Sequence, residues 1–136
     1  MSSSQNPDPK PSVESSIGTL HLVEYPHPAL FRKSKPLLRI DEGVRDAVEQ
    51  MFDIMYESHG VGLAANQVAL PYRMFVVNAT GDPNSGEELA FLNPILTRPR
   101  GTAIQAEGCL SLPGLRADVR RPQRVVVEAW SIDGEP

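Results

Sequence analysis

The sequence predicts an α+β domain in which antiparallel sheets follow an N-terminal amphipathic helix. Apolar side chains recur at helical spacing over residues 42–57, and short β-branched and aromatic runs follow Gly60, separated by Gly, Pro, Asn and Asp. Because the helical and strand patterns occupy different parts of the chain, they fit an α+β arrangement. A chain of 136 residues that is 40% hydrophobic is long enough for one domain with its own core.

Residues 1–18 are expected to form a disordered tail, and residues 19–136 the folded domain. The first 16 residues contain six Ser and three Pro, and apart from Met1 only Val13 is apolar, so this segment buries too little surface to offset its ordering entropy. It has neither the apolar stretch of a secretory signal nor the Arg content of a transit peptide. The expected compartment is the cytoplasm, in keeping with a single Cys that has no partner for a disulfide.

The composition also argues against membrane and nucleic-acid partners. No apolar run approaches the ~18 residues that a membrane-spanning helix needs. The 13 Lys and Arg residues are scattered, and the 17 Asp and Glu residues leave a net charge of -4. We therefore expect no membrane contact and no direct nucleic-acid site.

The first half of the domain contains one predicted strand and the predicted helix. The strand covers residues 20–23 and ends at Pro26-His27-Pro28, because two prolines this close enforce an extended turn. Asp41 is a suitable N-cap for the helix over 42–57, whose apolar stripe consists of Val44, Val48, Met51, Phe52 and Met55. We expect the helix to end at His59-Gly60, with the Gly in the left-handed conformation.

Four further runs are predicted to be strands, namely residues 73–78, 89–92, 115–120 and 124–130. Residues 81–86 form the clearest loop, and Asn93-Pro94, Arg98-Pro99 and Arg121-Pro122 indicate further breaks. Asp133-Gly134 is favoured at a two-residue hairpin turn, yet no partner strand follows before Pro136. Since a natural domain rarely ends on the outgoing half of a hairpin, we expect the domain to be incomplete.

The stretch GVGLAANQ, residues 60–67, is the first of two candidate functional motifs. It formally fits a relaxed dinucleotide fingerprint, G-x-G-x-x-A. That fingerprint requires a strand before it and a helix after it, whereas a helical pattern precedes it here and Pro71 limits any following helix. What the motif offers is a backbone without side-chain bulk at Gly60 and Gly62, against which a substrate main chain fits, followed by the amide donor of Gln67.

The second candidate motif, EGCLSLPG at residues 107–114, contains the single thiol, Cys109. A lone Cys is usually a small buried hydrophobe, but the surrounding Gly, Ser and Pro indicate a fixed loop, and a thiolate there would attract a zinc or ferrous ion. A metal site needs about three protein ligands. The spacing of His21, His27 and His59 does not predict convergence on the thiol, so each is also interpreted as a solvent-facing or capping residue.

These two motifs resemble the first two of the three signature motifs of the peptide deformylase family, in the same order. The resemblance includes YPHPAL at residues 25–30, the helix at 42–57 and FLNP at residues 91–94. It implies a peptide deformylase-like α+β fold and a metal-dependent hydrolase that removes the formyl group from the N-formylmethionine of nascent polypeptides. The expected partner is therefore a nascent N-formylmethionyl polypeptide.

The resemblance also implies roles for individual residues. Cys109 would be the thiolate ligand of one divalent ion, Fe²⁺ or Zn²⁺. Gln67 and the backbone N–H of Leu110 would form an oxyanion hole, where each donor is worth a factor of ~10²–10³. The backbone of Gly60, Val61 and Gly62 would pair with the extended peptide, and Val61 would help to line the methionine pocket. Glu107 would hold its loop in place and would not act catalytically.

The third signature motif of the family, H-E-x-x-H on a central helix, is not present in this sequence, which has no His after His59. We therefore expect a domain that lacks the central helix, does not bind the metal stably and is inactive alone. Two alternatives remain. One is a degenerate, non-catalytic relative that binds peptide N-termini, and the other is an active short chain in which His21, His27 or His59 provide the missing ligands.

Overall fold

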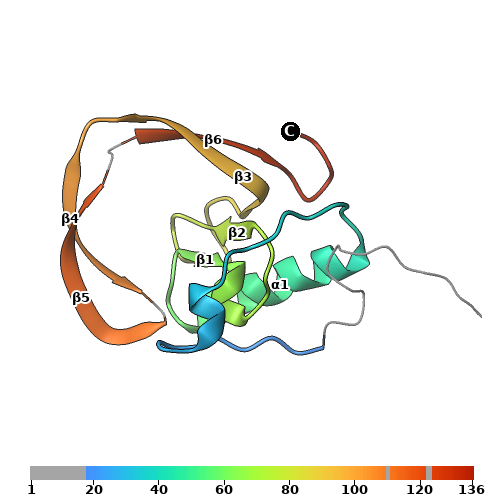
Figure 1. Cartoon of the computed structure of the whole chain (residues 1–136), viewed down its shortest axis with the longest axis horizontal. Coiled ribbons are helices and arrows are strands. Elements are labelled where there is room, and N and C mark those ends of the chain that lie inside the picture. Colours follow the sequence, from blue (N-terminus) through green and yellow to red (C-terminus); the bar gives the residue numbers. More distant parts are fainter. Residues whose placement is uncertain (1–17, 110, 122–123) are drawn as a thin grey trace, which may run out of the picture.

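The computed structural model describes the backbone of residues 18–109, 111–121 and 124–136, and the side chains of these residues except 103–109 and 112–120. The expected disordered tail lies outside the described residues up to residue 17. In chain order the elements are the 3-10 helix η2 (Pro28–Phe31), the helix α1 (Glu42–Glu57), β1 (Gly62–Ala64), the 3-10 helix η3 (Ala65–Val68), β2 (Met74–Val77), β3 (Leu89–Arg100), β4 (Ala103–Cys109), β5 (Leu112–Arg121) and β6 (Arg124–Trp130). One α-helix followed by antiparallel strands confirms the predicted α+β class (Figure 1).

Helix α1 has the predicted bounds and the predicted N-cap. The side chain of Asp41 accepts a hydrogen bond from the backbone N–H of Val44 at 3.1 Å, which satisfies one of the donors that a helix start leaves unpaired. The apolar stripe faces inward, and Val44, Met51 and Met55 are fully buried. They pack with residues of β1, β2, β3 and η3 in one hydrophobic core, which includes Leu63, Val68, Met74, Val76 and Leu92.

The end of α1 differs from the prediction, because His59 and not Gly60 adopts the left-handed conformation. His59 has φ 60°, and Ser58 is the C-cap. The N–H of His59 donates to the carbonyl of Tyr56 and that of Gly60 to the carbonyl of Met55, which closes a Schellman motif. The left-handed residue thus comes one position earlier than expected, although the helix bounds are as predicted, and Gly60 already belongs to the segment that leads into β1.

The described strands form two antiparallel sheets. The larger has the strand order β1-β2-β3-β6, with Leu63 opposite Val76 and Phe75 opposite Phe91. The smaller is the β4-β5 hairpin. Sequence patterns missed both β1 and β4. Strand β1 is three residues long and lies inside the Gly motif. Strand β4 begins at Ala103, before the second motif, and its last residues, Gly108 and Cys109, had been interpreted as part of a fixed loop.

Two expectations about breaks and strands were wrong. The residues at 20–23 form no strand, since their backbone bonds go to a side chain and to η3. Strand β3 continues through Pro94 and Pro99, where breaks were expected. Its pairing with β6 shifts register between Leu92 and Ile95 and again between Thr97 and Arg100, so each proline lies at an irregularity where the missing N–H removes no ladder bond.

The carboxyl end of the described chain turns where a turn was predicted, but the loop has three residues and not two. The N–H of Gly134 donates to the carbonyl of Ser131, so Ile132 and Asp133 are the central residues, and the N–H of Ser131 donates to the carbonyl of Glu135. Gly134, with φ 82°, is the left-handed residue that follows the turn. Before this turn the paired strands β3 and β6 carry exposed apolar side chains, among them Ile95, Leu96, Val125, Val126 and Trp130. Within the described residues, no helix is long and apolar enough to span a membrane.

Candidate active site

Both polar atoms of the Gln67 side-chain amide make hydrogen bonds. Its Oε1 accepts the backbone N–H of Ala64 at 3.0 Å, and its Nε2 donates to the hydroxyl of Ser111 at 3.4 Å. Ser111 is 2% exposed and follows Cys109 by two positions. Because the acceptor end is bonded to β1, the donor end is directed toward the second motif. The structure thus brings the two motifs together through an amide N–H, the type of group that stabilises a developing oxyanion.

The extended segment before Pro26 connects both motifs through its backbone. The N–H of Val23 donates to the carbonyl of Gln67, and the N–H of Tyr25 donates to the carbonyl of Ser111, each at 2.8 Å. The same segment is attached to α1, since the N–H of Leu20 donates to Oε1 of Gln50 at 2.8 Å. Gln67 and Ser111 are therefore positioned by a third part of the chain as well as by each other.

Strand β1 presents one free edge of the larger sheet. Its other edge pairs with β2, and just before it the carbonyl of Val61 accepts the N–H of Asn78 at 2.9 Å. Antiparallel pairing alternates, so the N–H and C=O of Gly62 are directed to the edge that β2 does not occupy. Ala64 shares this orientation, which is consistent with its N–H bonding the side chain of Gln67 on that edge. Beside this edge, Val61 is 54% exposed.

The structure places Cys109 only through its backbone. It is the last residue of β4, opposite Leu112 after a register shift in the β4-β5 ladder. The side chain of Cys109 and the whole of Leu110 lie outside the described residues, so the thiolate ligand and the second oxyanion donor stay predictions. Ser111, two positions after Cys109, nevertheless lies beside Gln67.

The described residues do not fit a metal ion. No group of three His, Cys, Asp or Glu side chains converges within the part of the chain whose side chains are described. Nδ1 of His27 accepts the backbone N–H of Ala29 at 3.0 Å as the cap of η2, and His59 takes the left-handed position after α1. These two residues are capping groups, as one of the two sequence interpretations expected. His21 is exposed.

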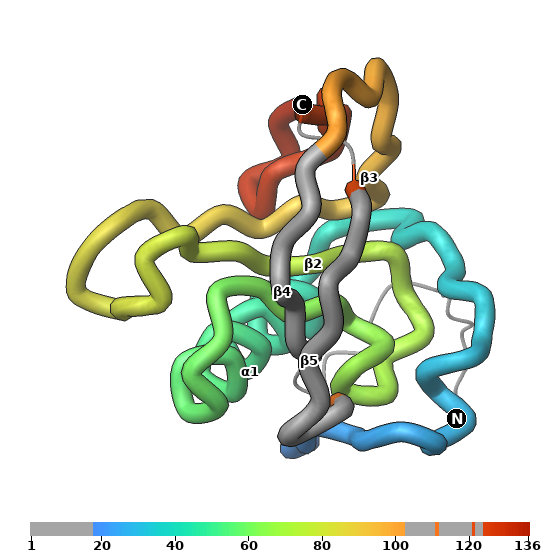
Figure 2. The backbone as a smooth tube through the Cα atoms, turned by 90° about the vertical axis from the view of Figure 1, so that its left-hand side faces the viewer, coloured from blue at the N-terminus to red at the C-terminus, as the bar shows by residue number. Residues whose placement is uncertain are grey.

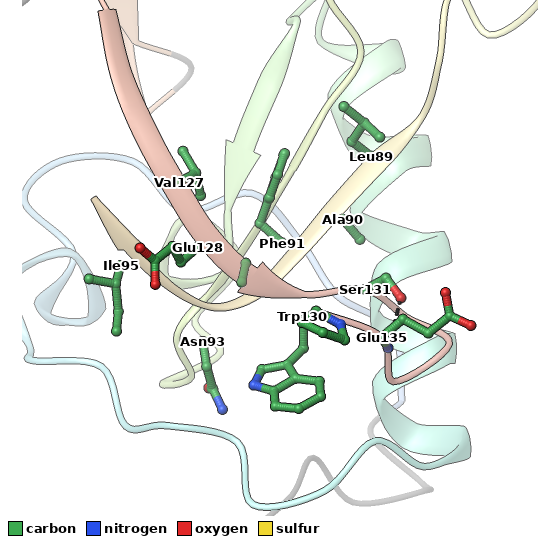
Figure 3. Close-up of a pocket in the computed structure, with 12 residues that line it drawn as sticks. Leu89, Ala90, Phe91, Asn93, Ile95, Val127, Glu128, Trp130, Ser131 and Glu135 are labelled. Atoms are coloured by element: carbon green, nitrogen blue, oxygen red, sulfur yellow. Dashed lines mark hydrogen bonds between the residues drawn. The ribbon is translucent and has the colours of Figure 1, made fainter. Parts of the chain in front are cut away.

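A cavity of about 630 Å³ is bounded by β3, β6 and the carboxyl-terminal turn, and Gln67 does not line it. Figure 3 shows Phe91, Val127 and Trp130 around it, with Glu128 and Glu135 also at its wall. This groove adjoins the exposed apolar surface of the β3-β6 pair and contains none of the predicted site residues.

Sequence reasoning missed three groups at or near the site. Ser111 was treated as part of a fixed loop, although it is the acceptor for Gln67. The backbone groups of Val23 and Tyr25 carry no side-chain signal, so no pattern could have identified them. Asn78 was assigned to the end of a strand, although an Asn followed two residues later by Thr80 is typical of turn chemistry.

The fold and the site together define an α+β protein with a fixed glutamine amide beside an open strand edge. The family model described as polypeptide deformylase matches residues 19–136. The peptide deformylase of Rhodopirellula baltica is 46% identical over 115 residues, which cover 85% of this chain and 57% of that protein. Peptide deformylase 1B of Arabidopsis thaliana is 42% identical, with 85% of this chain and 43% of that protein covered.

Solved structures agree with these sequence relationships. A crystal structure of plant peptide deformylase 1B has a TM-score of 0.82 at 42% identity and covers 85% of this chain and 64% of that chain. A peptide deformylase from Synechococcus elongatus in complex with actinonin has a TM-score of 0.83 at 34% identity and covers 86% and 64%. The chain belongs to the peptide deformylase family. It spans about half the length of the first two relatives, and members of the family are metal-dependent.

Proposed function

We propose that this chain binds the N-formylmethionyl end of nascent polypeptides and that its function is peptide deformylation. In this reaction the formyl amide is hydrolysed to formate and a free amine. The observation that supports it best is the fixed amide of Gln67, whose Nε2 is directed to the residues after Cys109. Since the substrate is a nascent chain, the proposed compartment is the cytoplasm.

In the proposed complex the peptide lies extended along the free edge of β1. The N–H and C=O of Gly62 pair with its main chain, and the exposed side chain of Val61 contacts the methionine side chain. This is strand addition, in which backbone bonds provide affinity and alternate side chains provide specificity. The formyl oxygen is placed at Gln67, so that Nε2 donates to the oxygen when it becomes negative in the tetrahedral state. The backbone N–H of Leu110 is the proposed second donor.

Cys109 is the proposed thiolate ligand of the metal, Fe²⁺ or Zn²⁺. The described side chains do not form a site for a metal ion. The steps that we assign to the described residues are therefore peptide binding and stabilisation of the oxyanion. A fixed donor costs little reorganisation when charge develops, which is the reason why a half-buried amide with both polar atoms hydrogen-bonded suits this role.

The direct test measures whether Gln67 recognises the formyl group. Purified chain is titrated with the peptide formyl-Met-Ala-Ser and with unformylated Met-Ala-Ser. We expect tighter binding of the formylated peptide in the parent and loss of this preference in Gln67→Glu, which retains an acceptor for the N–H of Ala64 but removes the amide donors. Gln50→Glu is the matched control, because Gln50 also holds a backbone N–H with Oε1 but lies on α1. No binding of either peptide by the parent would refute the proposal.

A second candidate is a non-catalytic relative that binds peptide N-termini. It is favoured by one observation, the lack of a described group of three potential metal ligands. Incubation with Fe²⁺ or Zn²⁺ and the formylated peptide separates the two functions. Release of formate would show deformylation by this chain and would overturn both the non-catalytic candidate and the expectation that the chain is inactive alone. Binding with formyl preference but without formate release agrees with both.

A further inference from the structure

The loop between β2 and β3 is built around one buried side chain, Asn78. This side chain is 0% exposed. Its Nδ2 lies 3.1 Å from the hydroxyl of Tyr56, 3.1 Å from the carbonyl of Asp82 and 3.0 Å from the carbonyl of Ser85, while Oδ1 accepts both the N–H and the hydroxyl of Thr80. Figure 2 shows that this loop projects beyond the strands it joins. Its conformation is therefore fixed from within by Asn78.

The interior of the loop beside Gly86 is filled by side-chain atoms of Asn78 and Thr80. A Cβ built at Gly86, which has φ 73°, would lie 2.5 Å from Oδ1 of Asn78 and 2.7 Å from Cγ2 of Thr80. The hydroxyl of Thr80 also accepts the N–H of Asp82 at 3.1 Å. Because these contacts surround Asn78 on several sides, a side chain with different hydrogen-bonding groups does not fit without a change of the loop.

The same loop is in direct contact with the segment that leads into β1. The backbone N–H of Asn78 donates to the carbonyl of Val61, and its own carbonyl accepts the N–H of Gly81. Gly81 has φ 68°, and a Cβ built there would lie 3.4 Å from Cγ1 of Val61 and 3.6 Å from the carbonyl oxygen of Gly60. Asn78 thus connects the loop to the backbone of the candidate peptide-binding segment, and Gly81 of the same loop lies near the side chain of Val61.

We propose that Asn78 is a positioning residue for peptide binding, acting through the loop 79–86 on the backbone and side chain of Val61. The proposal rests on the proposed function, since the peptide is expected to pair at Gly62. Asn78 does not contact the peptide. By holding the loop, it keeps the carbonyl of Val61 paired with β2, so that Gly62 presents its N–H and C=O outward in one orientation. Binding then requires little ordering of β1, which favours affinity.

The structure offers a matched control in Asn93. Its side chain also bridges distant backbone, with Oδ1 accepting the N–H of Leu37 at 2.7 Å and Nδ2 donating to the carbonyl of Leu37 at 2.8 Å. It lies on β3 away from β1. Asn78→Asp and Asn93→Asp are isosteric substitutions. In each, the side-chain NH₂ group that donates to a main-chain carbonyl is replaced by an oxygen that cannot donate. A general loss of stability would therefore affect both variants alike.

The first measurement is hydrogen exchange by mass spectrometry without ligand, at a temperature where circular dichroism shows both variants folded. For Asn78→Asp we expect amides of residues 60–64 to exchange about tenfold faster than in the parent, with residues 124–130 unchanged, since a loss of about 1.4 kcal/mol of local hydrogen bonding corresponds to a tenfold change. Asn93→Asp should leave residues 60–64 unchanged. Equal acceleration of residues 60–64 in both variants would overturn the proposal.

The second measurement is the affinity for formyl-Met-Ala-Ser. We expect Asn78→Asp to raise the Kd about fivefold or more, and Asn93→Asp to change it by less than about twofold. Thr80→Val, which removes only the hydroxyl that closes the loop, should have an intermediate effect and provides a test if Asn78→Asp fails to fold. Unchanged affinity and unchanged exchange in Thr80→Val and Asn78→Asp would refute the role of Asn78. If the parent does not bind the peptide, the proposed function fails, and the exchange experiment alone decides the positioning role.

Discussion

Two regions of the molecule differ in how far their apolar side chains are buried. In the packed region, formed by α1, β1, β2 and β3 up to Leu92, the sheet is covered by the helix, and Met51, Val76 and Leu92 are at most 1% exposed. In the open region, the β3-β6 pair beyond Leu92, Ile95 is 59% and Leu96 64% exposed. Both regions consist of paired antiparallel strands, although the β3-β6 ladder shifts register twice. The comparison shows that backbone pairing is enough to form the strands, whereas burial of their side chains requires another element packed on the sheet.

The largest difference is expected for truncation of a core side chain. Met51→Ala should lower the free energy of unfolding by about 2–5 kcal/mol, because the side chain is fully buried under the sheet. Leu96→Ala, a similar truncation in the open region, should change it by less than about 0.5 kcal/mol. Urea unfolding followed by circular dichroism measures both. Equal losses would show that the two regions do not differ in the way described.

Loss of the N-cap tests the packed region through its helix. Asp41→Ala should cost about 1 kcal/mol, since the bond from the N–H of Val44 is lost and the helix start keeps one more unpaired donor. Asp53→Ala, at an exposed position inside α1, is the control. Urea unfolding followed by circular dichroism measures both variants. An equal loss of stability in Asp53→Ala would contradict the role of the cap.

The smallest expected effect is a pH dependence at Tyr56. Partial burial, and after it the hydrogen bond to Glu88, raise the pKa of Tyr56 above its ordinary value of 10.0. The folded state therefore retains the proton longer than the unfolded state, and this contribution to stability is present below pH 10 and is lost as the pH rises above it. Tyr56→Phe should reduce the decline in stability above pH 10, and Tyr25→Phe at an exposed position should not. The same decline in all three proteins would exclude Tyr56 as its cause.

The sequence could predict those parts of the fold that depend on local patterns. The bounds of α1 and its N-cap follow from one apolar stripe and one Asp, and β6 from a β-branched run. Strand β1 could not be predicted, because a three-residue strand in a Gly motif has too few side chains for an alternating pattern. The continuation of β3 through Pro94 depends on register shifts against a strand much later in the chain.

The sequence predicted which residues belong to the candidate site better than it predicted how they are arranged. The resemblance identified Gln67 as the amide donor, and the structure directs its Nε2 toward the second motif, but its catalytic role stays a prediction. The bonds from Val23 and Tyr25 involve backbone groups that are common to every amino acid, so no residue type indicates them. The same holds for the link from Asn78 to Val61.

The backbone bonds of Val23 and Tyr25 also have a kinetic consequence. Gln67 and Ser111 are 44 residues apart, and the segment that joins them comes from the other end of the described chain. Contacts of such long sequence separation close large loops and tend to form late in folding, after local elements such as α1. The candidate site should therefore be among the last parts of the molecule to assemble, and binding of a peptide would report completion of folding.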